Sequence, residues 1–436
     1  MLADATNWDE AAYRESIYKE REIQTRTVFR TAWAPSLNGC PETIVAASSD
    51  GSIASYSIAS CISKLHFGYG NTRSLLAAEP HCFLQGHDGP AYDVKFYDNG
   101  NNTLLLSCGD DGHIRGWRWR ECTDIEVPIY LQGSHIEPVM DLMNPQYKGP
   151  WGALSPMPEN NAIASDAQSG SIFSAAGDSC AYCWDLESGK IKMVFKGHSD
   201  YLHCIVARNT VNQIITGSED GTARIWDCKS GKCIQLIDPA KDKKLKGHFS
   251  CIRCIALDAS ESWLACADGR SLSVWNLPSS EFISKTLTRS SMQDMVFCDN
   301  QILGVGAEPF LTRFDINGSV LSQIQCAPQS AFSVALHPSG VSSSRSSWGL
   351  WRSRGCYLAV WKPFMHILLS IQIKREIIHC FTALQQLRMW LEIGRCCFAS
   401  RYTCQRSCNP VTFCCGMQIT DNLYLWSYFS KVVCQY

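Results

Sequence analysis

The sequence lacks any segment that would carry the chain into or across a membrane. Its first residues, MLADATNWDEAAYRES, are polar, and no charged leader is followed by an apolar run. Neither a secretory signal peptide nor a membrane span is therefore indicated, and we expect no membrane partner. Without export, the 24 cysteines are expected to stay reduced rather than to pair as disulfides.

Side-chain sets typical of catalysis and cofactor binding are also missing. No Ser, His and Asp arrangement for nucleophilic catalysis is found, and GVGAEP, residues 304–309, is a lone Gly-x-Gly without the strand–turn–helix setting that binds nucleotides. The CxxC pairs Cys180/Cys183 and Cys251/Cys254 fall in expected strands, where residues three apart point to opposite faces. Because a zinc site needs converging ligands, we expect small buried thiols there. The sequence predicts no enzyme, cofactor or metal.

The net charge of −2 hides two different compositions. From Val341 onward, 11 Lys and Arg stand against 3 Asp and Glu, whereas residues 1–340 hold 28 basic and 38 acidic residues. Nine of the 24 cysteines also lie in this tail. We therefore predict that residues 341–436 are an aberrant or disordered tail, arising from a frame shift or a mis-spliced exon. A genuine C-terminal extension is the alternative.

A repeat dominates residues 25–340. The stretch ITGSEDGTARIWDCK has relatives in LLLSCGDDGHIRGW, SIFSAAGDSCAYCW and SWLACADGRSLSVW, each with small residues, a tight turn and a terminal Trp. A period near 40 residues, with Gly-His before and Trp-Asp after, is typical of WD40 repeats, which form one four-stranded blade each. The repeats predict an all-β, seven-bladed WD40 β-propeller. Blade seven begins in VLSQIQCAPQSAFSVALHPSG and is then disrupted by the tail.

Residues 1–24 have a different pattern. NWDEAAYRESIYKEREIQT predicts a helix before the first blade, with Asn7 as its N-cap and Glu10 three residues later in a capping-box arrangement.

Two repeats carry a full set of the polar side chains that join the strands of a WD blade. A His, a Ser or Thr, an Asp and a Trp form a buried chain, in which each hydrogen bond contributes about 0.5–1.5 kcal/mol. The fourth repeat has the whole set and also ends in Trp-Asp, so we predict that it is the most regular blade. The residues with this expected role are His87, Ser107, Asp111 and Trp117 in the second repeat and His198, Thr216, Asp220 and Trp226 in the fourth.

RGWRWRE, residues 115–121, mixes cations and aromatic rings as some RNA-binding proteins do. Strand alternation instead predicts Trp117 and Trp119 on one face and Arg118 and Arg120 on the other, which fits a blade edge. The acidic balance of the repeats also argues against a strong phosphate-binding surface. We expect any RNA contact to be indirect and the binding of other proteins to be the function.

Several stretches resemble one family more closely than WD40 repeats in general. NWDEAAYRESIYKEREIQTRTVFRTAWAP, KGPWGALSPMPE, GDSCAYCWDLESGKIKM and GAEPFLTRFD resemble the plant THO complex subunit 6 family, over residues 5 to about 340. The resemblance implies a nuclear, non-catalytic WD40 scaffold of the THO/TREX assembly, which couples transcription to mRNA processing and export. It implies other THO/TREX subunits as partners, and a link to small-RNA biogenesis.

The fourth repeat also resembles the box by which plant WD proteins dock the damaged-DNA-binding adaptor of cullin-4 RING ubiquitin ligases. The resemblance implies an alternative function, that of a substrate receptor of such a ligase. Cys228 departs from the box where an aliphatic residue is usual, and an ordinary well-formed blade explains the stretch as well. The residues that match the box are Ile214, Ile215, Asp220, Trp226, Asp227 and Lys229.

Overall fold

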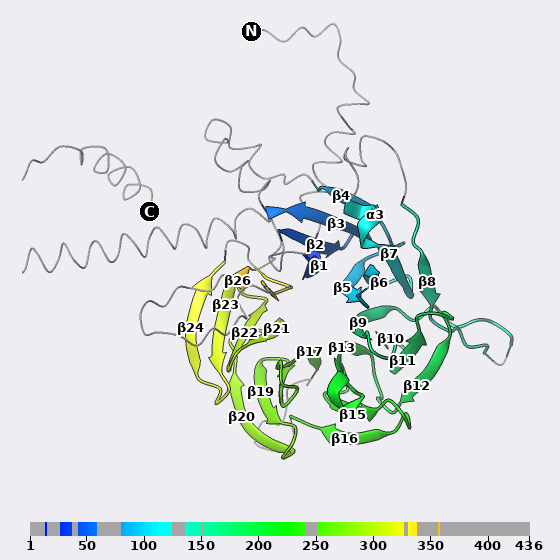
Figure 1. Ribbon diagram of the computed structural model, residues 1–436. Coiled ribbons are helices and arrows are strands. Elements are labelled where there is room, and N and C mark those ends of the chain that lie inside the picture. The colour runs from blue at the N-terminus through cyan, green and yellow to red at the C-terminus, as the bar shows by residue number, and fades with distance from the viewer. Residues whose placement is uncertain are drawn as a thin grey trace, which may run out of the picture. The chain divides into compact units, whose positions relative to one another are not determined.

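The computed structural model describes residues 14, 27–36, 42–58, 80–100, 102–123, 136–149, 151–239, 251–326, 330–337 and 356–357. The chain divides into two units, Met1–Ile373 and Lys374–Tyr436, and every described residue lies in the first. Six four-stranded antiparallel sheets are arranged as the blades of a ring (Figure 1). The prediction of an all-β propeller is therefore confirmed. Within the ranges just given, no helix is long and apolar enough to span a membrane.

Each blade uses four strands that are consecutive in sequence, with the first strand innermost in the ring (Figure 1). Blades one to three are β1 (Val28–Trp33), β2 (Thr43–Ser48), β3 (Ser52–Ser57) and β4 (Cys82–Gln85); β5 (Ala91–Asp98), β6 (Thr103–Gly109), β7 (His113–Arg118) and β8 (Met140–Met143); and β9 (Asn160–Asp166), β10 (Ser171–Ala176), β11 (Cys180–Asp185) and β12 (Ile191–Lys196). Blades four to six are β13 (Leu202–Arg208), β14 (Gln213–Ser218), β15 (Ala223–Asp227) and β16 (Cys233–Ile237); β17 (Ile252–Leu257), β18 (Trp263–Asp268), β19 (Ser271–Asn276) and β20 (Glu281–Leu287); and β21 (Met292–Cys298), β22 (Gln301–Gly306), β23 (Phe310–Asp315) and β24 (Val320–Gln325).

The second strand of each blade explains why the repeats are rich in small and aliphatic residues. β14 (QIITGS) and β22 (QILGVG) are buried from their second residue to their last, because both faces of the strand pack against neighbouring blades. The outermost strand β24 (VLSQIQ) has no blade beyond it and is mostly exposed. The hydrophobic core is thus a set of layers between blades.

Asp-Gly turns join the second and third strands of several blades. Gly112 and Gly221 have φ angles of 73° and 80°, in the left-handed region that side chains disfavour. A Cβ on Gly112 would also collide with Met157. The Asp-Gly pairs that mark the repeats in the sequence are therefore required by turn geometry.

Residues 330–337 close the ring between blades six and one. Within this stretch, β25 (Ala335–Leu336) contacts β1 and β21 and pairs with β26 (Cys356–Tyr357) in a two-stranded sheet. The backbone N–H of Thr31 in blade one donates to Ser333 Oγ (3.1 Å). The chain therefore leaves blade six and returns to the side of blade one.

The bonds at this closure repeat a pattern found elsewhere in the ring. The backbone N–H of Ile163 in blade three donates to the carboxylate of Asp93 in blade two (3.0 Å). In the same way, the backbone N–H of Val334 donates to Asp294 of blade six (2.8 Å). Residues 330–334 thus have the register of an inner strand that follows blade six.

Arg30 of blade one joins both of these acidic residues. Its Nε lies 3.2 Å from Asp93 Oδ1, and its Nη1 forms an ion pair with Asp294 Oδ1. Burial disfavours the charged guanidinium, but the two carboxylates raise the pKa of Arg30 above its ordinary value. One partly buried cation therefore links blades one, two and six.

The described residues do not include a full seventh blade or a full N-terminal helix, the two elements expected at the ends of the propeller. The ring has six full blades, and at the seventh position the described residues supply only the pair β25–β26 rather than four strands. The predicted helix over residues 1–24 lies outside the described residues, apart from Arg14, which is helical. A full seventh blade and the N-terminal helix thus stay predictions.

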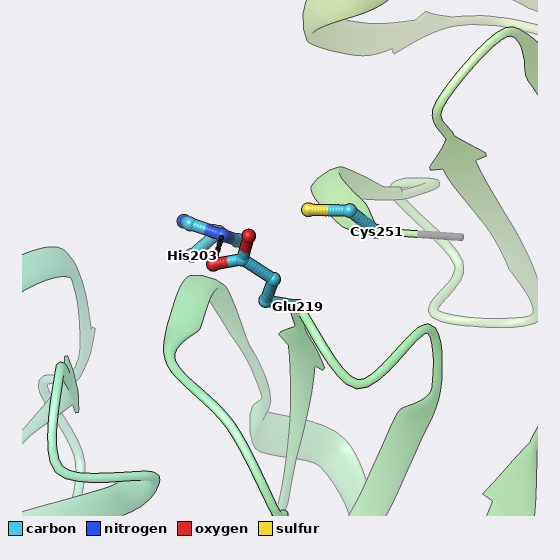
Figure 2. A group of neighbouring side chains, drawn as sticks. All are labelled: His203, Glu219 and Cys251. Carbon is cyan, nitrogen blue, oxygen red and sulfur yellow. Dashed lines mark ion pairs between the residues drawn. The ribbon is translucent and has the colours of Figure 1, made fainter. Parts of the chain in front are cut away.

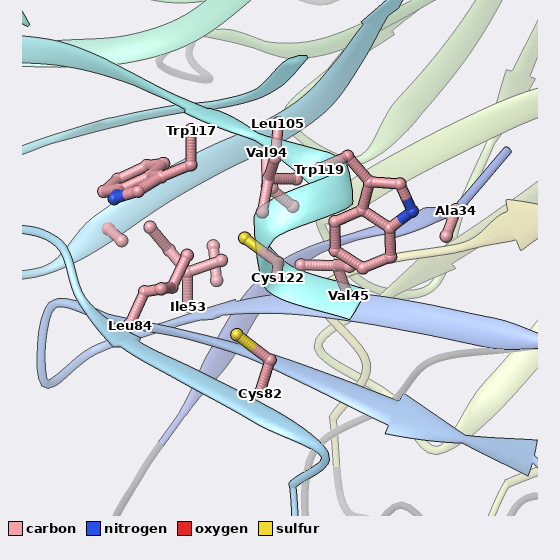
Figure 3. Close-up of a cluster of buried hydrophobic side chains, with 12 residues drawn as sticks. Ala34, Val45, Ile53, Cys82, Leu84, Val94, Leu105, Trp117, Trp119 and Cys122 are labelled. Carbon is pink, nitrogen blue, oxygen red and sulfur yellow. The ribbon is translucent and has the colours of Figure 1, made fainter. Parts of the chain in front are cut away.

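Residues 115–121 do not form one strand, although Trp117 and Trp119 are buried and Arg118 and Arg120 are exposed, as predicted. β7 ends at Arg118, and residues Trp119–Thr123 form the short helix α3. Trp119 and Cys122 lie three residues apart on this helix and point into the core between blades one and two (Figure 3). Trp117 is buried in the same cluster, so neither indole ring is available to stack on RNA bases.

Candidate functional site

Blade four contains a complete buried polar chain. His198 bonds through Nδ1 to Asp220 (2.7 Å) and through Nε2 to Thr216 Oγ1 (2.9 Å), and Trp226 Nε1 donates to the same hydroxyl oxygen (2.8 Å). Burial alone would raise the pKa of Asp220, but hydrogen bonds from His198 and Thr222 lower it below its ordinary value. Each member of the chain has its partner inside the blade, so the chain fixes blade shape and leaves no group for a ligand.

Blade two contains a variant of this chain. His87 bonds to Asp111 (2.9 Å) and to Ser107 Oγ (2.7 Å), and Arg115 Nη1 donates to Asp111 (2.6 Å). Burial would raise the pKa of Asp111, but His87 and Arg115 hold it below its ordinary value. Trp117 packs nearby in the core shown in Figure 3.

Blade six has a cavity where blade four has its polar chain. By strand pairing, Gly304 takes the place of Thr216 and Phe314 that of Trp226. The resulting space of about 290 Å³ is lined by Gly304, Phe314 and Met292 among others. A Cβ on Gly304 would collide with Met292, so packing explains the glycine of GVGAEP.

The docking-box residues of blade four divide into an internal and a surface group. Asp227 and Lys229 lie at the end of β15 opposite the Asp220 turn, and there the Lys229 side chain is exposed. The others have their side chains committed to the blade interior: Ile214, Ile215, Asp220 and Trp226.

Asp227 has a structural role in this surface group. Its carboxylate accepts hydrogen bonds from the backbone N–H and the hydroxyl of Ser230 (3.0 and 2.6 Å), which hold its pKa below the ordinary value. Asp185 of blade three accepts the same two bonds from Ser188 (3.1 and 2.5 Å). Turn formation therefore explains Asp227, and among the box residues only Lys229 presents an exposed side chain to a partner.

A different surface carries more exposed apolar area. It lies between β7 and β9, in the described part of residues 139–155, which we call the apolar segment. Trp151 is 96% exposed, unlike the buried Trp residues of the blades. Exposed large apolar side chains gathered in one segment indicate a candidate interaction site. The large apolar side chains exposed in the segment are Val139, Met143, Tyr147, Trp151 and Leu154.

Backbone hydrogen bonds hold the apolar segment in a hairpin-like turn. The N–H of Gly149 donates to Ala153 O (2.8 Å), and the N–H of Gly152 donates to Gly149 O (3.0 Å). Below the tip, the N–H of Ser155 donates to Tyr147 O (2.7 Å). Trp151 therefore lies between residues whose backbone groups these hydrogen bonds join.

Side chains also attach the apolar segment to blade three. The Tyr147 hydroxyl lies 3.3 Å from that of Tyr182, and Lys196 Nζ lies 5.6 Å from the Tyr147 ring centre. At the base of the segment, Asn144 Nδ2 donates to Pro158 O and to Asn160 Oδ1, both at 2.9 Å. The exposed indole is thus carried by a segment fixed to the scaffold.

Sequence reasoning quoted part of this segment, KGPWGALSPMPE, only as a mark of family resemblance and assigned it no role. A usable signal was present, because a Trp placed outside the blade rhythm among Gly residues has no core position to fill. The two side chains of each CxxC pair were expected to point to opposite faces of a strand. Cys180 and Cys183 pack in different core clusters, which agrees with this expectation.

Comparison with known proteins identifies the repeats and their relatives. The WD domain, G-beta repeat family matches residues 78–118, 189–227 and 240–276. Over 343 residues, the chain is 58% identical to THO complex subunit 6 of Arabidopsis thaliana, which covers 78% of this chain and 92% of the relative. It is 27% identical to THO complex subunit 6 of Homo sapiens over 309 residues, 70% of this chain and 82% of the relative. It is 27% identical to the THO complex subunit 6 homolog of Danio rerio over 319 residues, which is 72% of this chain and 88% of the relative.

Proposed function

Because the chain belongs to the THO complex subunit 6 family, we propose that it acts as a non-catalytic WD40 scaffold that binds other THO subunits. The proposal extends to a nuclear role in the THO/TREX assembly, which couples transcription to mRNA processing and export. The blade chemistry supports it, since the described polar chains have their partners inside their own blades.

The observation that carries the proposal is the exposed Trp151. A large aromatic side chain that a structured turn holds in solvent loses little conformational freedom on binding, and Trp is enriched among the residues that dominate interface energy. We propose that the apolar segment contacts a THO subunit and that Trp151 is its anchor. Because this contact is protein to protein, it requires no RNA.

The test compares Trp151→Ala with wild type in co-purification with THO subunits, with and without ribonuclease. Truncation of a central anchor costs about 2 kcal/mol or more, so binding should weaken roughly 30-fold while ribonuclease has no effect. Leu321→Ala is the matched control, because Leu321 is also exposed but lies on the outer strand β24. Unchanged binding by Trp151→Ala would remove the apolar segment from the interface. Loss of wild-type binding after ribonuclease treatment would contradict direct scaffolding.

The domain limits belong to the same proposal. We propose that residues 25–340 form a propeller of seven-bladed design, that residues 1–24 precede it as a helix, and that residues 341–436 are not native propeller sequence. The length shared with the Arabidopsis relative, 343 residues, supports this division. The register of residues 330–334 supports a seventh position in the ring.

A second candidate function, substrate receptor of a cullin-4 ligase, depends on the surface position of Lys229 alone. The relatives named above are THO subunits, so they lend this candidate no support. Lys229→Glu should leave the melting temperature nearly unchanged, since exposed charge changes usually alter stability by less than about 0.5 kcal/mol. If the box docks an acidic adaptor surface, this variant should lose adaptor binding but keep THO binding. Adaptor binding equal to wild type would leave the box as an ordinary blade.

A further inference from the structure

Three side chains from blades four and five meet at one end of the ring (Figure 2). His203 is the second residue of β13, Glu219 lies in the turn between β14 and β15, and Cys251 directly precedes β17. Each offers one metal-binding atom, and these atoms all lie within 4.8 Å of one another. Segments up to 48 residues apart thus bring nitrogen, oxygen and sulfur ligands together.

The backbone fixes all three positions. The N–H of Glu219 donates to Tyr201 O (2.9 Å), which ties the turn to the start of β13. The N–H of Gly269 donates to Cys251 O (3.2 Å), which ties Cys251 to the end of β18. The His203 position follows from the pairing of its two neighbours on β13, Leu202 and Cys204, with β14. His203 thus occupies the irregular step in the β13–β14 register between these two paired residues.

The imidazole of His203 has a nitrogen with an unfilled bonding position. Nε2 is shielded from solvent and makes no hydrogen bond to any described group, although it lies 3.4 Å from Glu219 Oε2. A buried nitrogen without a hydrogen bond is unfavourable, and a metal bond would satisfy it.

The distances suit a small tetrahedral ion. Zinc bonds of about 2.0–2.3 Å place neighbouring ligand atoms roughly 3.3–3.8 Å apart. The His203–Glu219 separation of 3.4 Å already falls in this range. The other pairs of ligand atoms lie within 4.8 Å, so Cys251 Sγ needs to move by at most about 1 Å to reach this spacing.

The surrounding charges favour a cation on balance. Carboxylates of Asp200 and Asp268 act on the cluster in addition to Glu219, whereas Arg253 opposes it. Metal binding must displace the proton of the Cys251 thiol, because the thiolate is the form that binds metals. Thiolate and imidazole ligands select zinc over magnesium or calcium.

We propose that His203, Glu219 and Cys251 form a zinc site that joins blade four to blade five, with water as the fourth ligand. The sequence argument considered Cys251 only with Cys254, three residues further along the chain, and so missed ligands supplied by the adjoining blade. The site lies at the end of β15 opposite Lys229, so it is separate from the docking box. It is also independent of the proposed THO contact at Trp151.

Cobalt titration of the full-length protein under a non-thiol reductant tests the proposal. Co²⁺ bound by a thiolate has a charge-transfer absorption, and one equivalent should depend on Cys251. Cys251→Ser should abolish that equivalent, and His203→Gln should weaken it at least about 100-fold, since even outer-shell changes weaken metal binding 10–100-fold. Cys233→Ser is the control, because Cys233 is an exposed thiol in blade four. Its titration should match wild type.

Thermal denaturation provides the second readout. One equivalent of Zn²⁺ should raise the melting temperature of wild type and of Cys233→Ser, and should not raise that of Cys251→Ser or His203→Gln. If Cys251→Ser binds cobalt with the stoichiometry and affinity of wild type, the metal binds elsewhere and the proposal is wrong. Absence of any zinc-dependent shift in wild type would overturn it as well.

Discussion

Replacement of Arg30 by Met tests how the ring is held closed. The guanidinium lies between two carboxylates whose side chains are 1% and 7% exposed, those of Asp93 and Asp294. Removal of one partner from a buried ion pair costs about 3–5 kcal/mol, because the remaining charge is left without compensation. Here a single substitution leaves two such charges.

Backbone donors reduce this effect. Asp93 still accepts the N–H groups of Val94 (2.9 Å) and Ile163 (3.0 Å). Asp294 likewise keeps its bonds from neighbouring backbone N–H groups. We therefore expect Arg30→Met to lower the free energy of unfolding by about 3 kcal/mol, the lower end of this range. For a domain of this size that loss lowers the melting temperature by roughly 5–10 °C.

Urea unfolding and thermal denaturation measure the change. The triple variant Arg30→Met, Asp93→Asn, Asp294→Asn removes the charges yet keeps the acceptors, so it should recover more than half of the loss. Arg118→Met is the surface control, since its ion pair with Glu121 (3.1 Å) is exposed and should contribute less than about 1 kcal/mol. If Arg30→Met unfolds within about 0.5 kcal/mol of wild type, the ion pairs do not hold the ring.

Three further predictions concern the blades and the tail. The pKa of Asp111 is lower in the folded chain than its ordinary value near 3.8, so the unfolded chain binds more protons in acid. The free energy of unfolding should therefore fall as the pH drops below about 4, and it should fall less steeply in Asp111→Asn. Unfolding measured over a series of acidic pH values would show this difference. Cys266 occupies in blade five the position that Thr216 has in blade four, and the buried Trp275 Nε1 makes no hydrogen bond to any group in the described structure. A Thr hydroxyl at position 266 could accept that bond, so Cys266→Thr should raise the free energy of unfolding in urea by about 1 kcal/mol. Limited proteolysis should cleave residues 341–436 and leave the blades intact, and a transcript that encodes this frame together with a protease-resistant tail would refute the tail prediction.

The repeat rhythm predicted the blades because the same physical requirement recurs in each. Small residues on the second strand, Gly at the left-handed turn and Trp at the end of the third strand follow from packing between layers. Spacing alone predicted the polar chain of blade four and the bonds of His87 in blade two, whereas the bond from Arg115 to Asp111 was not predicted. Local sequence determines these features, so one sequence suffices to find them.

Contacts between blades were beyond that reasoning. Nothing in the spacing of the sequence relates Arg30 to Asp294, which lies in the blade on the other side of the closure. His203 and Cys251 likewise come together only because blades four and five are neighbours in the ring. Helix α3 was missed because strand alternation was extended past Arg118, where the fourth strand of the blade does not follow at once.

The position of the apolar segment follows from the way a propeller is held together. Each blade is held by its inner strand and by the two blades beside it, so an insertion between strands at the edge leaves those contacts intact. A longer loop also raises the entropic cost of loop closure only slightly. The 21 residues between the end of β7 at Arg118 and the start of β8 at Met140 are such an insertion, which the fold tolerates. Bonds to Tyr182 and Asn160 then attach the following turn to blade three. An aromatic anchor carried there can be exposed for a partner while the blades that support it stay rigid.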